Sequence, residues 1–453
     1  MLHLPDSLLK ELHSIKSFDE KAFVAAHATN PVTSVRLNPT KKIDMFTGME
    51  QVPWCRGGYY LPERPVFTLD PAYHAGAYYV QEASSMFLAH VLAPILKDKK
   101  GLRVLDLCAA PGGKSTLIAS LLDRESLLVS NEVIRPRASI LEENMTRWGY
   151  MNTWVTGNDP RDFSKLEGYF DIIVVDAPCS GSGLFRKDIR ALDEWSKANV
   201  QLCGERQQRI LANVWPALKE NGILIYATCS YSPQEDEEIL DWLATEYSAG
   251  ALPVLLKEEW GIAETITGKN MHGYRFFPDK VKGEGFFLGA VQKNEETGAS
   301  YMPKFKTANN RKIKEQADYL LQDPGMIYLQ TGEEDFSAIN PAHEADLQIL
   351  QKVVYMRKTG LKLGKPASKE WLPDHEVALG IDANKNLQNI ELNKEQALHF
   401  LKREEMGIGN INKGWYIMKY NGLGLGWVKG LGNRSNNYLP KSWRIRMELP
   451  DMD

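Results

Sequence analysis

VLDLCAAPGGKST, residues 104–116, decides the fold. An apolar run leads into a turn of small residues, and a helix-forming run follows, as expected for a buried strand, a tight turn and a helix start. In open parallel sheets, ligands bind beyond the carboxyl ends of strands, and small residues there let a ligand approach the backbone closely. The stretch therefore predicts a strand–helix unit with a ligand-binding turn.

Strands and helices alternate regularly after this stretch. Strands are expected at residues 103–109, 127–133, 153–157, 170–178 and 222–230, and helices at 114–122, 135–149, 209–219 and 234–247. Strands separated by such helices predict an α/β domain with a doubly wound, mostly parallel, Rossmann-like sheet. Residues 284–293 are expected to add a late edge strand.

The chain has 453 residues, which is long enough for more than one domain. An α/β lead-in precedes the doubly wound domain, with helices expected at 8–15, 20–27 and 81–96 and a strand at 34–39. A polar stretch without apolar periodicity follows the sheet and reads as a linker, and the elements beyond it are shorter. The boundaries predicted are 1–98, 99–295, a linker at 296–315, an intermediate α+β domain at 316–390, and a last domain at 391–453.

Charge and cysteine content indicate which partners and which cellular compartment to expect. The formal net charge is −4, which does not by itself indicate a nucleic-acid binder, although a local basic face remains compatible with it. The five cysteines are odd in number and form no CxxC pair, which argues against a disulfide framework or a metal site. No signal peptide or long apolar run is present. We expect a cytoplasmic monomer without a metal or a membrane segment.

The turn at 108–114 is read as a cofactor site. Glu132 lies about twenty residues beyond Gly112, where an acid accepts hydrogen bonds from both ribose hydroxyls, and Asp159 could reach an adenine amine. A phosphate-binding P-loop does not fit, because its pattern needs glycine where Cys108 stands. A dinucleotide site does not fit either, because the GxGxxG fingerprint is absent. A purely structural turn remains an alternative. A methionine-derived cofactor carries no phosphate and needs neither pattern.

Two thiols follow neighbouring strands of the predicted sheet. Cys179, in DAPCSGSG, follows the strand at 170–178, and Cys229, in ATCSYS, ends the strand at 222–230. Both loops open at the edge that holds the cofactor turn, so the thiols are expected to converge there, although an isolated cysteine at such a place is commonly a small core residue.

The chemistry that needs a thiol beside a methyl donor is methylation of a ring carbon. Carbon 5 of cytosine is a poor nucleophile until a thiolate adds to carbon 6. Asp176 can then hold the ring nitrogen and the exocyclic amine. An exocyclic amine would need no thiol, because its nitrogen already has a lone pair.

These motifs resemble those of the Sun/Fmu (NOL/NOP/SUN) family of RNA 5-methylcytosine methyltransferases. The resemblance covers roughly residues 30–295 and rests on CAAPGGK, DAPCSGSG and ATCSYSPQEDE, with further matches in NPVTSVRLNPTKK, QEASS and NEVIRPR. It implies transfer of a methyl group from S-adenosyl-L-methionine to cytosine in ribosomal RNA, with Cys229 as the nucleophile and Cys179 assisting release. The cofactor contacts implied are Cys108, Ala109, Ala110, Pro111, Gly112, Gly113, Lys114, Glu132, Asp159 and Asp176.

The resemblance extends to the outer domains. It implies that the lead-in binds RNA and that Arg186 and Lys187 lie near the RNA substrate, although both could be solvated surface cations. The carboxyl-terminal third is similar to the bacterial ribosomal-RNA branch of the family (RsmF-like), which ends in a small PUA-like barrel. Residues 411–446 contain seven basic residues and no acid, interleaved with aromatics, as expected where cations meet phosphates and aromatics stack on bases. The ribosomal RNA or small ribosomal subunit is the expected partner.

Three alternatives remain open at this point. A catalytically idle RNA-binding or ribosome-assembly factor could keep the same fold without the reaction. A DNA cytosine-5 methyltransferase would use the thiol after the fourth strand as its nucleophile and would not need Cys229. An amine methyltransferase would modify a nitrogen instead of a ring carbon.

Overall fold

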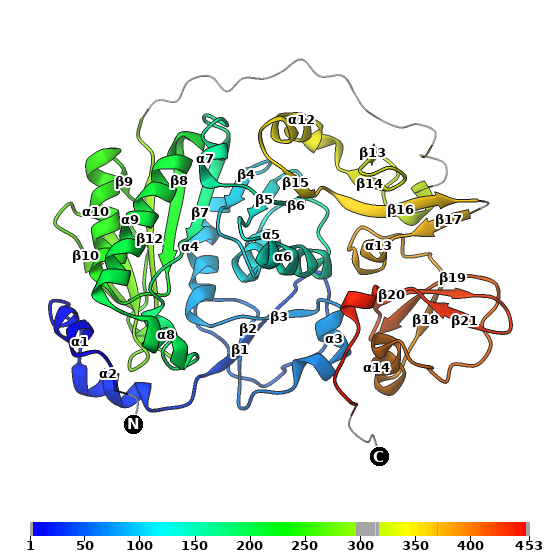
Figure 1. Ribbon diagram of the computed structural model, residues 1–453, viewed down its shortest axis with the longest axis horizontal. Helices are drawn as coiled ribbons and strands as arrows, with labels where there is room; N and C mark the ends of the chain where they lie inside the picture. The colour runs from blue at the N-terminus through cyan, green and yellow to red at the C-terminus, as the bar shows by residue number, and fades with distance from the viewer. Residues whose placement is uncertain (1–2, 296–312, 314–316, 369, 450–453) are drawn as a thin grey trace.

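The structure is a computed structural model that describes residues 3–295, 313, 317–368 and 370–449. At its centre is a ten-stranded sheet in which nine strands follow the order β10-β11-β12-β8-β7-β4-β5-β6-β15, and β9 pairs with β12 (Figure 1). The bounds of these strands are β4 Arg103–Asp106, β5 Leu127–Asn131, β6 Thr153–Thr156, β7 Phe170–Asp176, β8 Leu218–Thr228, β9 Gly250–Ala251, β10 Ala263–Ile266, β11 His272–Phe276, β12 Phe286–Gln292 and β15 Met356–Lys358.

The five strands from β4 to β8 in the chain form a parallel core with the order β8-β7-β4-β5-β6. The predicted doubly wound, mostly parallel sheet is therefore confirmed. Side chains alternate between its two faces: Val104 and Ile172 belong to one apolar core, whereas Leu105 and Ile173 belong to the other. Both faces are buried, which explains the nearly continuous apolar runs of the sequence.

Helices cover both faces of the sheet. One face packs against α4 (Phe87–Leu96), α5 (Gly113–Leu121) and α6 (Arg135–Trp148), and the other against α7 (Pro160–Phe163), α9 (Lys197–Val214) and α10 (Glu237–Glu246). A short helix, α8 (Ile189–Glu194), precedes α9.

Several predicted boundaries were wrong. The helix expected through residue 219 ends at Val214, because Pro216 lacks the N–H group that a continuing helix needs, and β8 begins at Leu218. The helix expected from residue 81 begins only at Phe87, after a short 3-10 turn. The late strand β12 is not at the edge of the sheet, because the hairpin of β10 and β11 pairs beyond it.

The amino-terminal segment forms a small sheet beside α5. It contains α1 (Asp6–Leu12), α2 (Glu20–His27), α3 (Pro71–His74) and the antiparallel strands β1 (Thr33–Leu37), β2 (Gly58–Leu61) and β3 (Tyr78–Val80) in the order β2-β1-β3. The predicted helices at 8–15 and 20–27 correspond to α1 and α2.

The carboxyl-terminal part contains two four-stranded sheets. One has the order β13-β14-β16-β17, and the other has the order β18-β19-β20-β21. The bounds are β13 Ile327–Gln330, β14 Phe336–Ile339, β16 Leu361–Ala367, β17 Glu370–Pro373, β18 Asn389–Glu391, β19 Gly414–Tyr420, β20 Leu423–Gly430 and β21 Ser435–Asn437, with helices α12 Glu344–Val353, α13 His375–Leu379 and α14 Lys394–Lys402. Almost all of the linker expected at 296–315 lies outside the described residues.

The carboxyl-terminal part contacts the rest of the chain at several places, of which two concern the sheets. Strand β15 pairs antiparallel with β6 and extends the large sheet. Tyr420 and Leu423 of the last sheet pack against the apolar cluster of the amino-terminal segment, around Val35 and Tyr78 (Figure 1). The strands of the amino-terminal segment and the last sheet therefore pack against each other.

Candidate active site

The turn between β4 and α5 is held open by groups from α6. The guanidinium of Arg137 donates to the carbonyl of Ala110 at 2.8 Å, and the amide of Asn144 donates to the carbonyl of Pro111 at 2.8 Å. Gly112 caps α5 with a φ of 113°, a conformation that strongly favours glycine. The turn is thus a fixed, small-residue surface at the carboxyl ends of the strands, where the sequence predicted it.

Three carboxyl groups gather around this turn. Glu132 follows β5 and is only 4% exposed, and its carboxylate accepts a hydrogen bond from the backbone of Ile134 at 2.9 Å. Asp106 ends β4, is fully buried, and accepts from the Ser115 hydroxyl at 2.6 Å. Burial, together with the negative charges of Asp176 and Glu132, raises the pKa of Asp106 to about 7.

Cys108 lies among the same acids. Burial and the charges of Asp106, Asp176 and Glu132 raise the pKa of its thiol, so it remains protonated. This part of the site is therefore electronegative, with an uncharged sulfur at its centre. Such surroundings favour a positively charged ligand.

Lys114 and Asp176 connect the turn to the thiol loops. The ammonium group of Lys114 lies 2.7 Å from Oδ2 of Asp176, which ends β7. Burial disfavours the charge of Lys114, but the carboxylates of Asp176 and Asp106 outweigh it and raise the pKa of Lys114. Lys114 is therefore held in its charged form, and the side chain of Asp176 is 35% exposed.

The two thiols meet at the same edge of the sheet. The sulfur atoms of Cys179 and Cys229 lie 3.1 Å apart, since β7 and β8 are parallel neighbours with Asp176 in register with Ala227. The hydrogen bond with Cys229 and burial both raise the pKa of Cys179 well above that of an ordinary thiol. Cys179 is thus the member of the pair that keeps its proton.

Asp159 lies at the same edge but outside this group of acids. It caps α7 by accepting a hydrogen bond from the backbone of Arg161 at 3.1 Å, and its side chain is 49% exposed. Its neighbour Asn158 is buried and bonds to Asn131 and to the backbone of Tyr355. The structure therefore gives Asp159 a helix-capping role and leaves its second oxygen open to solvent.

The expectation that Arg186 contacts RNA does not fit its surroundings. Its side chain is only 4% exposed, and Nε and Nη2 each lie 2.9 Å from the carboxylate of Glu284, which is itself 2% exposed. The guanidinium is used inside the protein to join the loop after β7 to the residues before β12. Lys187, by contrast, is exposed.

Sequence reasoning missed Arg36 and Gln81 of the amino-terminal segment. Arg36 is 3% exposed, and its guanidinium donates to the side chain of Gln81 at 2.8 Å. It also donates to the hydroxyl of Thr116, in the first turn of α5, at 2.7 Å. It also stacks over Trp148, with 4.8 Å between Cζ and the ring centroid. The motifs NPVTSVRLNPTKK and QEASS contain these residues, but nothing local in them indicates that they support the cofactor turn.

Two further findings concern the described part of the chain as a whole. None of its helices has the length and apolar character needed to cross a membrane. Its histidines, cysteines and acids form no cluster of three or more that could hold a metal ion.

The chain is similar to known proteins along nearly its whole length. Residues 92–292 match the family described as 16S rRNA methyltransferase RsmB/F, residues 4–83 the N-terminal domain of 16S rRNA methyltransferase RsmF, and residues 387–445 the methyltransferase RsmF PUA domain. The sequence is 32% identical to ribosomal RNA small subunit methyltransferase F of Aliivibrio salmonicida, over 97% of both chains. It is 30% identical to the protein of the same name from Shewanella woodyi, over 96% of this chain and 95% of that one.

Solved structures share the fold. A methyltransferase homolog protein from Pyrococcus horikoshii is 26% identical, has a TM-score of 0.52, and is matched over 64% of this chain and 100% of its own. NSun6 from Pyrococcus horikoshii with SFG is 18% identical, has a TM-score of 0.53, and is matched over 64% of this chain and 99% of its own.

Proposed function

This chain belongs to the RsmB/F family of 16S ribosomal RNA methyltransferases, and we propose that it methylates carbon 5 of a cytosine in small-subunit ribosomal RNA through a covalent cysteine–cytosine adduct. The observation that supports this most directly is the pair of sulfur atoms 3.1 Å apart, beside the ion pair of Lys114 and Asp176. Methylation of an amine nitrogen would need neither thiol.

The residues around the turn fit S-adenosylmethionine, which carries a sulfonium and an ammonium charge and supplies the methyl group when it is bound. The acids Glu132 and Asp176 provide complementary negative charge, and Asp106 adds a carboxyl group whose pKa is raised to about 7. Oδ1 of Asp106 is buried and has no hydrogen-bond partner among the described residues, so it can accept from an amine. We assign the turn at 108–114 and Glu132 to cofactor binding, and Asp159 to the adenine end of the same site.

The thiols have different parts in the proposed reaction. The thiolate of Cys229 forms a bond to carbon 6 of the cytosine, which makes carbon 5 an enamine-like nucleophile. Asp176 accepts a hydrogen bond from the exocyclic amine and from the ring nitrogen once that nitrogen is protonated, and Lys114 holds Asp176 in place at 2.7 Å. After methylation, the proton on carbon 5 is removed and the bond to the Cys229 sulfur breaks.

Cys179 is suited to assist the last step. Its hydrogen bond with Cys229 is the largest cause of its raised pKa, so Cys179 holds its proton while Cys229 is free. Once the sulfur of Cys229 is bonded to carbon, it is a weaker hydrogen-bond partner, and the proton of Cys179 is held less firmly. Cys179 then gives its own proton to solvent, and the resulting thiolate is the base that accepts the proton from carbon 5 as the bond between carbon 6 and the Cys229 sulfur breaks.

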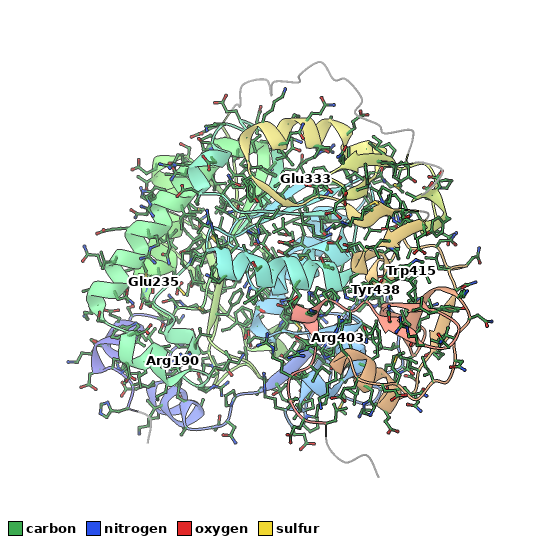
Figure 2. The ribbon with its side chains drawn as sticks, turned by 45° about the vertical axis from the view of Figure 1, so that its right-hand side comes forward. Arg190, Glu235, Glu333, Arg403, Trp415 and Tyr438 are labelled. Carbon is green, nitrogen blue, oxygen red and sulfur yellow. The ribbon has the colours of Figure 1, made fainter. Side chains whose placement is uncertain are left out.

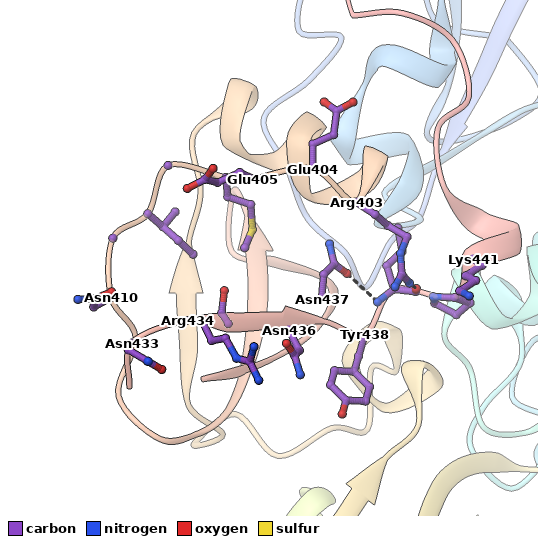
Figure 3. Close-up of a pocket in the computed structure, with 17 residues that line it drawn as sticks. Arg403, Glu404, Glu405, Asn410, Asn433, Arg434, Asn436, Asn437, Tyr438 and Lys441 are labelled. Carbon is purple, nitrogen blue, oxygen red and sulfur yellow. Dashed lines mark hydrogen bonds between the residues drawn. The ribbon is translucent and has the colours of Figure 1, made fainter. Parts of the chain in front are cut away.

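The carboxyl-terminal domain is the proposed RNA-binding module. Among the described residues, six cations of this region form no ion pair with an acid, namely Lys413, Lys419, Arg434, Lys441, Arg444 and Arg446, whereas Lys429 pairs with Glu370. An open cavity of about 920 Å³ is lined by Arg403, Arg434, Asn436, Tyr438 and Lys441. Figure 3 shows Arg434, Asn436 and Tyr438 along one side of β21 and its two flanking residues.

Aromatic residues of this domain divide between its core and its surface. Trp427 is buried, but Tyr438 is 38% exposed and packs edge-on against Trp415, with 4.6 Å between the ring centroids (Figure 2). An exposed aromatic ring next to amides and cations suits an unpaired base and its phosphate. With the amino-terminal segment at 1–98, this domain at 391–453 would guide RNA toward the methyltransferase domain at 99–295.

The test is transfer of labelled methyl groups from S-adenosylmethionine into naked 16S ribosomal RNA and into small subunits, followed by mass analysis of the modified nucleosides. We expect 5-methylcytosine, and we expect sequencing of ribosomal RNA from cells lacking the protein to show one or more unmodified cytosines. Methylation on a nitrogen would contradict the proposed chemistry. Absence of transfer to every ribosomal substrate would favour the idle assembly factor.

A further inference from the structure

One buried carboxyl group joins the two thiol loops. Oε1 of Glu235 accepts a hydrogen bond from the backbone of Ser180 at 2.7 Å, and Oε2 accepts from the hydroxyl of Ser180 at 2.6 Å and from that of Ser230 at 2.5 Å. Ser180 directly follows Cys179, and Ser230 directly follows Cys229. A single side chain thus holds the residue next to each sulfur.

The backbone of Glu235 is also fixed. It lies in the turn Pro233–Glu235 between β8 and α10, and its carbonyl accepts a hydrogen bond from the hydroxyl of the buried Tyr226 at 2.6 Å. Figure 2 places Glu235 in the green part of the ribbon, which contains β8 and α10. The carboxyl group is therefore a rigid support rather than a mobile surface acid.

The charge of Glu235 has no counter-ion among the described residues, unlike that of the next two acids in the chain. Asp236 and Glu237 both form ion pairs with Arg275, whereas Glu235 is 0% exposed and is stabilised by the three donors of the serines. Burying an acid without a cation costs free energy unless its hydrogen bonds are complete. An apolar residue would fill the same space at lower cost, but it could not join the loops.

Other contacts also hold the backbones of the two loops. The backbone N–H of Gly183 donates to the carbonyl of Cys229 at 2.8 Å, and the hydroxyl of Ser182 accepts from the backbone of Tyr231 at 2.8 Å. One of these bonds is made at Cys229 itself and the other lies beyond the cysteines, and neither involves Ser180 or Ser230. The negative charge of Glu235 is, after the hydrogen bond with Cys229 and burial, among the causes that raise the pKa of Cys179.

We propose that Glu235 is a positioning residue that sets the separation of the two sulfurs, so that attack by Cys229 and release assisted by Cys179 occur on the same base. This inference rests on the proposed function of the thiols. A reactive group that is misplaced by about 1 Å can lose about a hundredfold in rate, which is the size of effect expected when the support is removed.

The test compares Glu235→Gln with Glu238→Gln. Glutamine keeps the shape of Glu235, but its amide nitrogen only donates, so either the backbone N–H of Ser180 loses its acceptor or both serine hydroxyls must turn from donating to accepting. Glu238 is exposed on α10 and serves as the matched control. For Glu235→Gln we expect a fall of about a hundredfold in kcat, with the KM values for cofactor and RNA within about twofold of wild type. For Glu238→Gln we expect no change.

Two serine variants separate positioning from general support. Ser230→Ala releases only the Cys229 loop and is expected to slow formation of the covalent RNA adduct. Ser180→Ala removes the side-chain bond next to Cys179 and is expected to slow release, so that the adduct accumulates on a denaturing gel. These variants also serve if Glu235→Gln does not fold.

The outcomes distinguish this inference from the proposed function. If wild-type protein forms 5-methylcytosine but Glu235→Gln and both serine variants keep more than half of its kcat, the role of Glu235 is wrong and the thiol chemistry stands. If the wild type forms no 5-methylcytosine, the proposed function itself fails.

Discussion

The sulfur atoms of Cys179 and Cys229 lie 3.1 Å apart, although the two residues are separated by fifty positions in the chain. Parallel pairing of β7 and β8 brings the ends of these strands together, and each cysteine is placed within three residues of its strand end. The Lys114–Asp176 ion pair lies at the same edge. In the reaction we propose, the two thiols act on one substrate with different tasks.

Replacement of each cysteine should therefore have a different result. Cys229→Ala should abolish methyl transfer, because no other thiol can attack carbon 6. In Cys179→Ala, Cys229 should still attack carbon 6, but the methylated RNA should be released slowly. A covalent RNA adduct should therefore accumulate and be visible on a denaturing gel. Full turnover by Cys229→Ala would show that the nucleophile has been assigned wrongly.

Asp106 should make stability depend on pH. Its pKa in the folded protein is about 7, well above the ordinary value of 3.8, because it is buried next to other acids. Between these values the unfolded chain loses the proton and the folded protein keeps it, so the free energy of unfolding falls as pH rises through this window. Above pH 7 the buried Asp106 carboxylate lowers the free energy of unfolding by its full amount.

Asp106→Asn should remove this cost and still accept the hydrogen bond from Ser115. The variant should match wild type near pH 4 and exceed its free energy of unfolding by up to about 4 kcal/mol at pH 8. Chemical denaturation followed by tryptophan fluorescence, without added cofactor, measures the difference. A difference that stays constant from pH 4 to pH 8 would contradict the pKa of Asp106.

Arg186 should matter for stability rather than for direct RNA contact. Arg186→Ala would leave Glu284 buried at 2% exposure without its cation, and removing one partner of a buried pair costs about 3–5 kcal/mol. Lys187→Ala, at the exposed neighbouring position, should change the free energy of unfolding by less than about 0.5 kcal/mol. Equal denaturation midpoints for the two variants would argue against a buried ion pair.

The unpaired cations of the last domain should determine the salt dependence of RNA binding. Arg434→Ala and Lys441→Ala should each weaken binding and reduce the slope of log affinity against log salt by about one unit. Lys429→Ala is the matched control, since Lys429 is already paired with Glu370 and should change the slope less. Identical slopes for the three variants and wild type would place the RNA elsewhere.

Much of the site could be predicted from local sequence. The alternation of apolar strands and helices indicated the parallel sheet, and the positions of Cys179 and Cys229 after adjacent strands predicted that they would meet. Both inferences depend on short-range patterns and on a general rule about where the ends of parallel strands lie. The cofactor turn at 108–114 was recognisable for the same reason.

Other parts left no local signal. A cation such as Arg186 looks the same in sequence whether it is solvated or paired with Glu284, 98 residues away. Strand β15 has three residues, and its pairing with β6 spans about two hundred positions, so neither its length nor its composition indicated that it extends the large sheet. Glu235 stood in a recognised motif, but its motif did not indicate which loops it joins.

The sequence by itself therefore determined the type of sheet and the edge at which the turn at 108–114 and the two thiols come together, because periodicity and strand ends are properties of short segments. Only the tertiary structure decided which buried acid bonds to both thiol loops, which cation forms an internal ion pair, and how the carboxyl-terminal part joins the sheet. These depend on contacts between residues far apart in the chain, whose free energies are fixed by burial and by partners that no short segment contains.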